Sequence, residues 1–311
     1  MSKFFLIFIN LISLSSFSEV KRDTSHVGIY VKTLYDMTPA DLSFGADFYI
    51  WNINKDSVSL FKKVEIVNAK RLEDYSSFIE RDGNTFVSYE NSKGQLTHNW
   101  DLRRYPFDKQ KLRIVLEAQY NTDIMFVTDD KYNFQIGDEI KLPGWKIKKY
   151  YIEKSLAGYS NDFGYHNSGA KSKNYNRLSF VIEIARNGWG LYFKLFTGLY
   201  IAFLVSFLAF FIKPDYVDPR FGLGIGGLFA SVGNKYVVDT NVPATISFSF
   251  VDMVHFLCFA FIFATLVIST ISLKLYTSGK IEKSKKLDRR GAIVVMALYL
   301  LLNIALIIFT V

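Results

Sequence analysis

Two ionisable residues stand inside an otherwise apolar stretch of the chain. Asp252 and His255 are three residues apart, so a helix would place them on one face. An ionisable group within a hydrophobic span is costly and is often functional. Histidine titrates near neutral pH, so this pair could sense protons. The alternative is a hydrogen bond between helices that has only a structural role.

The remaining residues with catalytic potential are scattered along the chain. The four histidines stand at positions 26, 98, 166 and 255, and Cys258 is the one cysteine. The sequence has no H-E-x-x-H or G-x-S-x-G motif, no Walker loop and no cluster of Cys and His ligands. A single thiol also excludes an intrachain disulfide. We therefore expect neither an enzyme nor a bound metal or cofactor.

Composition places these residues in a membrane protein. Half of the 311 residues are hydrophobic, with 29 Phe and 19 Tyr, which is rich for a soluble globule. The formal net charge of +8 is compatible with nucleic acid or with an anionic membrane surface as the partner. The positions of the charges must decide between the two.

Four segments are candidates for membrane-spanning helices, at about residues 191–212, 221–238, 248–273 and 292–311. The first, third and fourth are apolar and long enough to cross a bilayer. The second contains five glycines together with Asn234 and Lys235. It is too polar to face lipid, so we expect other helices to surround it.

Charge in the connecting loops predicts the orientation. Residues 274–290 carry seven basic and two acidic side chains, whereas residues 239–247 carry no Lys or Arg. The positive-inside rule places 274–290 in the cytoplasm, with the N-terminal domain and the C-terminus outside the inner (plasma) membrane. Residues 1–18 resemble a signal peptide, which agrees with this orientation. The basic run is therefore an orientation signal, and we expect no nucleic-acid partner.

Residues 19–187 are expected to form an extracellular all-β sandwich, immunoglobulin-like, with about ten strands. Apolar and polar residues alternate in 42–51, 112–117 and 178–184, as in half-buried strands. Many short strands separated by turns suggest two packed sheets. Residues 188–311 would follow as a four-helix transmembrane domain.

Several motifs resemble those of the pentameric ligand-gated ion channels, the Cys-loop receptor superfamily. RRYPFDKQKL, residues 103–112, closely resembles the signature loop of the family, whose bacterial members also lack the disulfide. PRFGLGI, residues 219–225, resembles the start of the pore helix in the glycine-receptor branch. VVDTNVP, residues 237–243, resembles the outer end of that helix in proton-gated bacterial members. Weaker matches in the family's order are VEIVNA (64–69), Gly144-Trp145 and Arg186.

The resemblance implies a homopentamer, in which each chain assembles with four copies of itself in membrane lipid. The second span would line a pore for permeant ions. The sandwich would bind an unknown small molecule, or protons, at the subunit interfaces. The alternative is a non-conducting membrane receptor of the same architecture, although the short cytoplasmic loop offers little surface for an intracellular partner.

The face of the second span that would line the pore follows from helical spacing. Steps of four and three residues keep side chains on one stripe of a helix. The stripe that begins at Asp218 consists of Asp218, Gly222, Gly226, Phe229, Gly233, Tyr236 and Thr240. A ring of five Phe229 side chains in mid-membrane would form a hydrophobic gate that closes by dewetting. Otherwise Phe229 contacts neighbouring helices and the glycines serve close packing.

The charges near the two mouths of such a pore conflict. Asp218 at the inner end and Asp239 at the outer end would form acidic rings, which favour cations. Arg220, however, lies next to Asp218 in a motif that resembles the anion-selective branch. We expect cations to be favoured.

The resemblance also implies residues that couple the two domains. In the family, an aspartate of the signature loop meets the arginine that precedes the first span. The coupling candidates here are Arg104, Pro106, Asp108, Arg186 and Pro243. A desolvated Arg–carboxylate pair is bidentate and strong, whether or not it transmits a signal.

The ligand site is implied at loops of adjoining subunits. The candidate residues are Asn68, Lys70, Gln119, Tyr120, Tyr159, Phe163 and Tyr165. The last three aromatics could cage a cation through their π faces, or could be incidental in a polar loop. Because Gln119 stands where animal receptors carry an aromatic residue, a quaternary-ammonium ligand is not implied.

Overall fold

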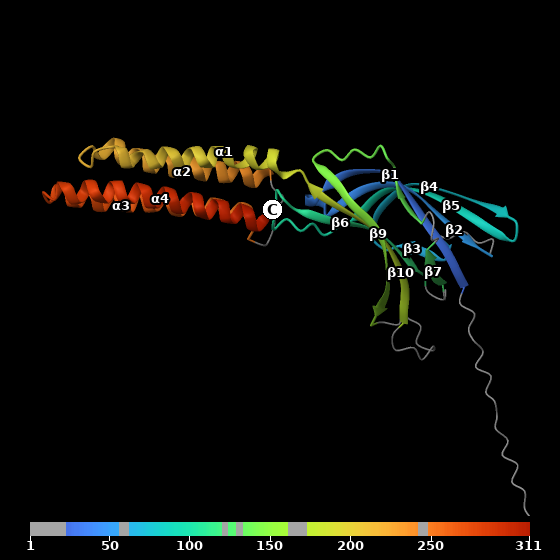
Figure 1. Ribbon diagram of the computed structural model, residues 1–311. Helices are drawn as coiled ribbons and strands as arrows, with labels where there is room; N and C mark the ends of the chain where they lie inside the picture. The colour runs from blue at the N-terminus through green and yellow to red at the C-terminus, as the bar shows by residue number, and fades with distance from the viewer. Residues whose placement is uncertain (1–22, 56–61, 120–123, 129–132, 161–172, 242–247) are drawn as a thin grey trace, which may run out of the picture.

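The computed structural model describes residues 23–55, 62–119, 124–128, 133–160, 173–241 and 248–311. Figure 1 shows a β-domain built from the first part of the chain and a bundle of helices built from the second. The expected signal peptide, residues 1–18, lies outside the described residues.

Within the described residues, ten strands form two sheets. One has the order β4-β5-β2-β1-β7, with β8 also pairing with β1, and the other has the order β3-β6-β10-β9. The strands are β1 (Asp23–Thr38), β2 (Ser43–Asn54), β3 (Val64–Ile66), β4 (Ala69–Asp82), β5 (Thr85–Thr97), β6 (Lys109–Ala118), β7 (Ile124–Thr128), β8 (Phe134–Ile136), β9 (Trp145–Tyr159) and β10 (Lys173–Arg186). The expected sandwich of about ten strands is confirmed.

Alternating apolar side chains build the core between the two sheets. Phe44 and Phe48 of β2 are fully buried, and so are Leu112 of β6 and Phe180 of β10. Successive side chains of a strand point to opposite faces, so each strand contributes every second residue to this core. Burying one such side chain contributes about 1.5–3 kcal/mol.

Four long helices follow the sandwich: α1 (Gly188–Phe207), α2 (Val217–Asn241), α3 (Phe250–Thr277) and α4 (Ile281–Thr310), with the short helix η3 (Leu208–Phe211) continuing α1. Three of them are long and apolar enough to cross a membrane, namely α1 with η3, α3 and α4. Glycine-rich α2 is a helix but is not among these three. In the single chain α2 packs on one side only, so the expectation that other helices surround it stays a prediction.

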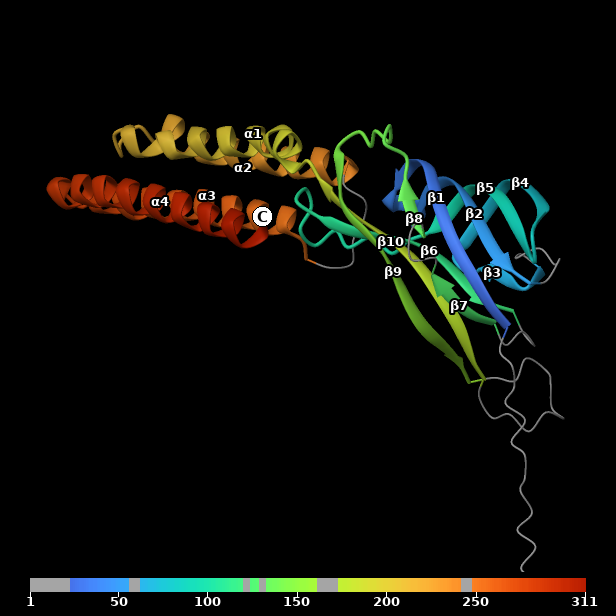
Figure 2. The ribbon, with the colours of Figure 1, turned by 45° about the vertical axis from the view of Figure 1, so that its right-hand side comes forward.

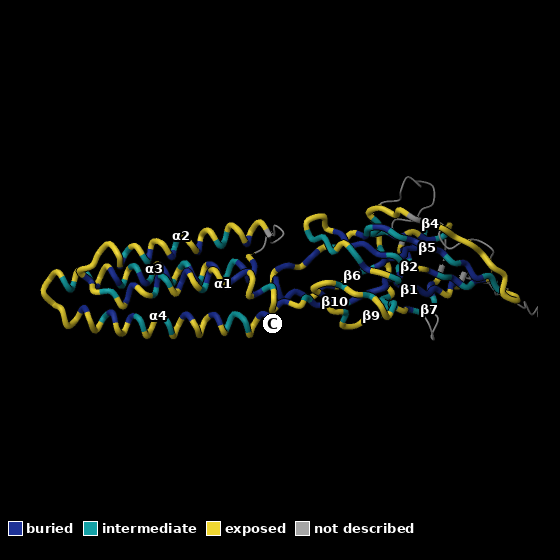
Figure 3. Tube along the Cα trace, turned by 90° about the horizontal axis from the view of Figure 1, so that it is seen from above, coloured by how far each residue is buried: buried dark blue, intermediate teal, exposed yellow. Residues whose placement is uncertain are grey.

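The helices are arranged in a definite order around the bundle. α2 packs against α1 and α3, and α4 packs against α3 and η3. Figure 3 shows α2 and α4 on opposite sides, with α1 and α3 between them. The C-terminus lies beside the sandwich, and the turn between α3 and α4 lies at the far end of the bundle (Figures 1 and 2).

The segment expected as a cytoplasmic loop, residues 274–290, is mostly helical. α3 continues to Thr277 and α4 begins at Ile281, so three residues connect the two helices. Gly279 has a φ of 74°, a conformation that glycine adopts without strain, and it makes the turn possible. The basic residues of this segment therefore project from helix ends. The membrane boundaries themselves stay a prediction.

Candidate functional sites: the domain junction and the exposed face of α2

The sandwich and the helices meet at an ion pair between Asp108 and Arg186. Nε of Arg186 lies 2.6 Å from Oδ1 of Asp108, and the second guanidinium contact, to Oδ2, is 3.2 Å. The Asp108 side chain is 1% exposed and that of Arg186 is 15% exposed. The backbone N–H of Arg186 also donates to the Asp108 carbonyl at 3.0 Å. Two parallel charged hydrogen bonds make this a bidentate pair.

Further contacts satisfy the buried charges of this pair. The guanidinium of Arg186 lies 4.0 Å from the ring centroid of Trp145 and 4.8 Å from that of Tyr105. Nε2 of Gln110 donates to Oδ2 of Asp108 at 2.9 Å. A buried ion pair is tolerated when its remaining hydrogen-bonding groups have partners, and here the carboxylate has three donors.

A histidine extends this network into the sandwich. The His98 ring lies 3.4 Å from Oε1 of Gln110, and packs edge-on against Trp100 with centroids 4.8 Å apart. Burial of the ring lowers the pKa of His98 below its ordinary value, and the charge of Arg113 acts in the same direction. His98, Gln110, Asp108 and Arg186 thus form a continuous chain of polar contacts.

The signature loop also touches the starts of α1 and α3. The Phe107 ring packs against Trp189, Tyr192 and Phe250, and the N–H of Phe250 donates to the Arg103 carbonyl at 2.8 Å. A Cβ at Gly188 would lie 2.4 Å from the Pro106 carbonyl oxygen, so only glycine allows this approach.

The structure separates the coupling candidates. Asp108 and Arg186 meet, and Pro106, which follows a cis peptide bond, lies against the start of α1. Arg104 instead has an exposed side chain outside this ion pair. Its neighbour Arg103 pairs with Asp101 at the surface, at 2.6 Å. Pro243 lies outside the described residues.

All seven residues of the predicted stripe are exposed along α2 in the single chain. Phe229 is 72% exposed and Tyr236 is 77% exposed. A Cβ added at Gly222, Gly226 or Gly233 would meet no atom within 4 Å. Val232 and Val237 are also exposed and widen this face.

The opposite face of α2 packs against the bundle, and two of its glycines are needed there. A Cβ at Gly224 would lie 2.3 Å from the Leu266 side chain, and one at Gly227 would lie 2.7 Å from the Ala202 carbonyl oxygen. Ser231 and Val238 are buried on this same face. The five glycines of α2 therefore divide into two that permit close packing and three that line the exposed stripe.

Arg220 lies on the packed face and not on the stripe. It is fully buried, and Nη2 and Nη1 lie 2.5 Å and 3.0 Å from the two carboxylate oxygens of Asp288 on α4. Nη1 also donates to the carbonyl of Ile212 at 3.0 Å. The sequence-based reading placed Arg220 beside Asp218 at the pore mouth, but its charge is paired inside the subunit. The sequence gives one weak signal for its partner, an aspartate within a basic run.

At the other end of α2, Lys235 bridges two carboxylates. Its Nζ lies 2.5 Å from Oδ1 of Asp239 and 2.7 Å from Oδ1 of Asp252. Asp252 also forms a capping box with Ser249 at the N-terminus of α3. Asp252 therefore helps to cap the N-terminus of α3 and also holds Lys235 of α2 in an ion pair.

His255 has a structural place between three helices. Its Nδ1 lies 2.8 Å from the Val251 carbonyl oxygen and its Nε2 lies 3.1 Å from Oδ1 of Asn234. Nδ2 of Asn234 in turn donates to the Leu195 carbonyl on α1 at 3.3 Å. Of the two interpretations of Asp252 and His255, the geometry therefore fits hydrogen bonds and ion pairs between helices.

Among the described residues, the candidate ligand residues do not form one cluster in the single chain. Asn68 accepts from the N–H of Val115 at 3.1 Å and donates to the Arg113 carbonyl at 2.7 Å, which is a structural bridge. Nζ of Lys70 donates to the Asp41 carbonyl, and Nε2 of Gln119 donates to the Val64 carbonyl. Tyr120, Phe163 and Tyr165 lie outside the described residues.

Tyr159 belongs to a polar cluster that the sequence analysis did not identify. Its hydroxyl donates to Oε1 of Glu117 at 2.7 Å, and Nε of Arg177 donates to Oε2 at 2.8 Å. The hydrogen bond to Glu117 raises the pKa of Tyr159. The Tyr175 ring packs edge-on against Tyr159, with centroids 5.4 Å apart. Glu117 and Arg177 are cross-strand partners, which strand periodicity alone does not show.

The described residues contain no group of three His, Cys, Asp or Glu side chains that could hold a metal ion. The arrangement offers instead a rigid junction between two domains and a helix with one exposed, glycine-rich face.

Comparison with known proteins finds sequence relatives of the chain. No protein-family model matches the chain. It is 22% identical to the proton-gated ion channel of Gloeobacter violaceus over 244 aligned residues. The aligned segment covers 78% of this chain and 65% of the relative. It is 27% identical over 211 residues to the glycine receptor subunit beta of Rattus norvegicus, which covers 67% and 40%. It is 23% identical over 212 residues to the serotonin-gated chloride channel mod-1 of Caenorhabditis elegans, which covers 65% and 40%.

The chain thus spans about two fifths to two thirds of the length of these relatives. By their names, these relatives are a channel gated by protons, a receptor subunit for glycine and a chloride channel gated by serotonin. With the signature loop at the domain junction, four helices in the expected order and one cysteine in the sequence, the chain belongs to the pentameric ligand-gated ion channel (Cys-loop receptor) superfamily as a member without the Cys-loop disulfide.

Proposed function

We propose that the chain is the subunit of a homopentameric ligand-gated ion channel that conducts cations. The observation that carries this proposal is the seven-residue stripe, which is exposed along the whole of α2 while the opposite face packs on α1 and α3. α2 is not apolar enough to face lipid. In a pentamer, the five α2 helices turn their exposed stripes toward the central axis and enclose a water-filled pore. The glycines of the stripe have no side chains, so this pore is wide.

Phe229 is the gate in this proposal. It is the bulky member of the stripe between Gly226 and Gly233, and it is 72% exposed. Five such rings would form an apolar constriction that closes by losing its water. The absence of any atom within 4 Å of a Cβ at the two glycines supports an open wall on either side of this ring.

The charges support cation preference. Arg220 is buried and paired with Asp288, so it adds no free positive charge to the inner mouth. No cation of the described residues lies within ion-pair distance of Asp218, which is exposed. At the outer end, Lys235 lies between Asp239 and Asp252, which leaves one negative charge in the group of three. Acidic rings of this kind favour cations.

The junction provides the route from stimulus to gate. The chain of contacts from His98 through Gln110 to Asp108 and Arg186 ends at the signature loop, which binds α1 and α3 directly. A ligand at the subunit interface, or a proton in the outer domain, would displace this loop and with it the helices that hold α2. The agonist is a small molecule or a proton.

The same arrangement supports an orientation for the chain in the plasma membrane. The C-terminus and the sandwich lie at one end of the bundle (Figure 2). The basic residues of 274–290 lie at the other end, and positive charge favours the cytoplasmic side. We infer that the sandwich and the C-terminus are extracytoplasmic.

Reconstitution of the purified protein in planar bilayers tests the function. The expected result is discrete unitary currents that depend on agonist or pH, with a reversal potential in a salt gradient that reports cation selectivity. The tests run from about pH 4 to about pH 8, a range that brackets the titration of histidine. Silence throughout this range and across a ligand panel, from an assembly shown to be pentameric, would favour the alternative of a non-conducting membrane receptor. That alternative has less support, because the segment 274–290, which would face an inner partner, is short and offers little surface for binding.

A further inference from the structure

Three charged side chains meet at the C-terminal end of α2, beside the sandwich (Figure 1). From residue 221 to residue 273 the sequence has only three residues of the types Lys, Arg, Asp and Glu, namely Lys235, Asp239 and Asp252. The structure brings all three together, because Nζ of Lys235 contacts a carboxylate oxygen of each aspartate. Charge within a membrane span is costly and is often functional, so we looked for a role for this group.

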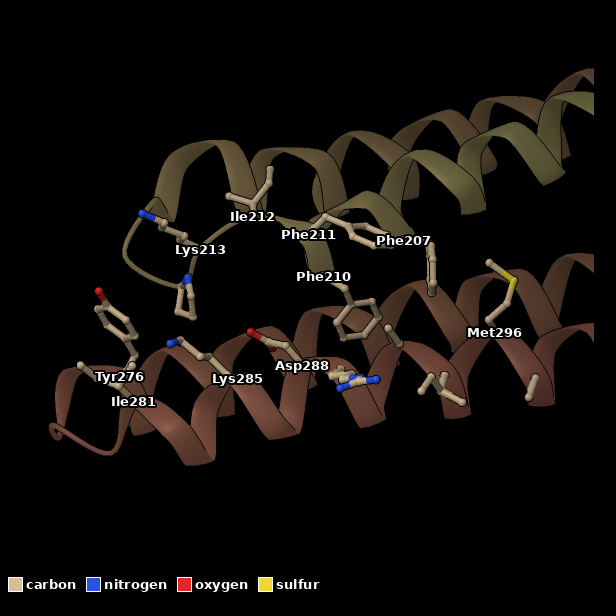
Figure 4. A pocket seen from close by; sticks show the side chains of 15 residues that line it. Phe207, Phe210, Phe211, Ile212, Lys213, Tyr276, Ile281, Lys285, Asp288 and Met296 are labelled. Atoms are coloured by element: carbon tan, nitrogen blue, oxygen red, sulfur yellow. The ribbon is translucent and has the colours of Figure 1, made fainter.

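The other end of the bundle is charged in a different way. Figure 4 shows a pocket of about 960 Å³ there, between η3 and α4, and its lining includes Lys213, Lys285 and Arg289. None of the three charges at the C-terminal end of α2 lines this pocket. The group of Lys235, Asp239 and Asp252 is therefore separate from the basic end of the molecule.

Asp252 is held more firmly than Asp239. Its Oδ2 accepts from the backbone N–H of Ser249 at 2.8 Å and from the Ser249 hydroxyl at 2.6 Å. Its Oδ1 meets Nζ of Lys235 at 2.7 Å. The carboxylate stands in the first turn of α3, where the helix dipole favours a negative charge. The Asp252 side chain is 26% exposed, whereas that of Asp239 is 54% exposed.

Asp239 is the weaker partner of the lysine. It follows Lys235 by four residues, and an acid placed after a base at this spacing stabilises a helix less than the reverse order does. It also lies in the last turn of α2, which ends at Asn241, and the dipole disfavours a negative charge there. Water screens its exposed carboxylate. Lys235 is therefore bound chiefly by Asp252.

The position of Asp239 around α2 connects this group to the exposed stripe. At about 100° per residue, Asp239 lies about 60° from Tyr236 of the stripe and about 40° from Lys235. Asp239 thus stands between the stripe and the lysine. The ion pair with Asp252 draws Lys235 toward α3 and away from the stripe. The exposed carboxylate of Asp239 then keeps most of its charge.

We propose that Asp252 sets the charge of the outer acidic ring by holding Lys235 away from Asp239. Asp252 lies on α3 and does not belong to the stripe, so it is a positioning residue that determines ion specificity through another side chain. Without its charge, Lys235 turns to Asp239, and the group loses its one net negative charge. This inference rests on the proposed function, in which Asp239 stands at the mouth of a cation-conducting pore.

Unitary currents of the full chain in planar bilayers test this role. Asp252→Asn keeps the size of the side chain and an oxygen that accepts from the N–H of Ser249, but removes the charge that holds Lys235. We expect its cation conductance at about 0.1 M salt to fall by about twofold or more, because an acidic ring concentrates cations at a pore mouth. At about 1 M salt the loss should nearly vanish, since the Debye length falls from about 10 Å to about 3 Å.

Removal of the lysine should reverse this loss. In the double variant Lys235→Gln/Asp252→Asn no cation turns to Asp239, so the conductance should return to at least the native value although Asp252 is still missing. A helix cap that only supports the fold would show neither this rescue nor the dependence on salt. An unchanged conductance in Asp252→Asn, or a loss that Lys235→Gln does not restore, would overturn the proposal.

Glu282→Gln is the matched control. Glu282 also stands in the first turn of a helix and pairs with a lysine, but it lies at the opposite end of the bundle. This variant should keep the native conductance at both salt concentrations. A loss equal to that of Asp252→Asn would show that any acid at a helix start has this effect, and would contradict the role of Asp252.

Thermal unfolding of the same variants tests the ion pair without any current. Lys235→Gln, Asp252→Asn and their double variant form one cycle, and Lys235→Gln with Asp239→Asn forms a second. We expect a clear coupling in melting temperature between Lys235 and Asp252, and a much smaller one between Lys235 and Asp239. A native pentamer that carries no current would refute the proposed function, whereas equal couplings in the two cycles would overturn the hold of Asp252 on the lysine.

Discussion

Asp108 and Arg186 stand 78 residues apart in the chain, and their side chains meet in a bidentate ion pair with an Nε to Oδ1 distance of 2.6 Å. One belongs to the signature loop, and the other is the last residue of β10. Two residues after Arg186, α1 begins. The pair therefore fixes the point where the chain leaves the sandwich and enters the helices.

Loss of either partner should weaken this junction strongly. Asp108→Asn leaves Arg186 with a buried, unpaired charge, and breaking such a pair costs about 3–5 kcal/mol. We expect a lower melting temperature for Asp108→Asn and for Arg186→Gln, together with a shifted agonist response in bilayer recordings. A double variant should lose less than the sum of the single losses, because the pair is already broken.

Asp101 and Arg103 provide the control for this experiment. They form an ion pair in the same stretch of chain, but the two side chains are 50% and 69% exposed. Asp101→Asn and Arg103→Gln should therefore change the melting temperature little. Equal effects for the exposed and the buried pair would show that the junction does not depend on Asp108 and Arg186.

Phe229→Ala should raise the leak current of the closed channel. The substitution removes the bulky ring from the middle of the stripe, so an apolar constriction would widen and stay wet. Recordings without agonist measure the effect. Val232→Ala is the matched control, because Val232 is 45% exposed at the edge of the same face but is not one of the seven residues of the stripe. A closed state that is unchanged in Phe229→Ala would refute the assignment of the gate.

Charge selectivity should depend on Asp218 and not on Arg220. Asp218→Asn removes an exposed charge at the inner end of the stripe, so the reversal potential in a salt gradient should move away from the cation value. Arg220→Gln should instead reduce stability or assembly, because it leaves Asp288 buried without a partner. A large shift in selectivity in Arg220→Gln, with normal assembly, would place that arginine at the pore.

The sequence predicts the parts of this molecule that depend on local spacing. The four–three steps from Asp218 need only the geometry of a helix, and they agree with the burial of the structure. Strand alternation in 178–184 agrees in part: its apolar face is buried, but Ser179 and Val181 on the other face are buried as well. The turn at Gly279, between α3 and α4, was harder to predict from the sequence. Its basic flanks resemble a loop in composition, but they continue α3 and α4. Charge density alone does not distinguish a polar loop from a helix that extends beyond the membrane.

Contacts between distant segments were not predictable in this way. Arg220 was read from its neighbour Asp218, yet a helical residue faces about 200° away from the residue two positions earlier. Its true partner, Asp288, lies 68 residues later. The Glu117–Arg177 pair depends in the same way on strand register across 60 residues. Neighbours in the chain, conversely, need not share contacts. Arg103 and Arg104 are adjacent in one loop, but it is Arg103 that pairs with Asp101 at the surface.

Gly227→Ala and Gly226→Ala should separate packing from pore lining. A Cβ at Gly227 would lie 2.7 Å from a backbone oxygen of α1, whereas one at Gly226 meets nothing within 4 Å. Overpacking of this kind costs about 1–3 kcal/mol, so Gly227→Ala should lower the melting temperature. Gly226→Ala should fold normally and reduce the unitary conductance by narrowing the wall. Equal melting temperatures would contradict the assignment of the packed face.

His98 should make the junction sensitive to acid. Burial lowers its pKa in the folded chain below the ordinary value of 6.5. Below pH 6.5 the unfolded chain therefore binds a proton that the folded chain resists, so this contribution to stability is complete above pH 6.5 and is lost as the pH falls toward the folded pKa. His98→Gln keeps a polar side chain beside Gln110 but cannot titrate. The melting temperature of this variant should depend less on pH over that window than that of the native chain.

The same variant tests whether the proton reaches the gate. The His98 ring donates to Oε1 of Gln110, and in its protonated form it carries a positive charge that Arg113 repels, so acid should disturb the path through Gln110 to Asp108. If protons activate the channel, the pH of half-maximal current should fall in His98→Gln. His26→Gln, in which an exposed histidine of β1 is replaced, controls for the loss of a histidine elsewhere in the sandwich. Parallel pH profiles for the native chain and both variants would show that acid acts on other groups, and would leave Asp108 and Arg186 with a structural role alone.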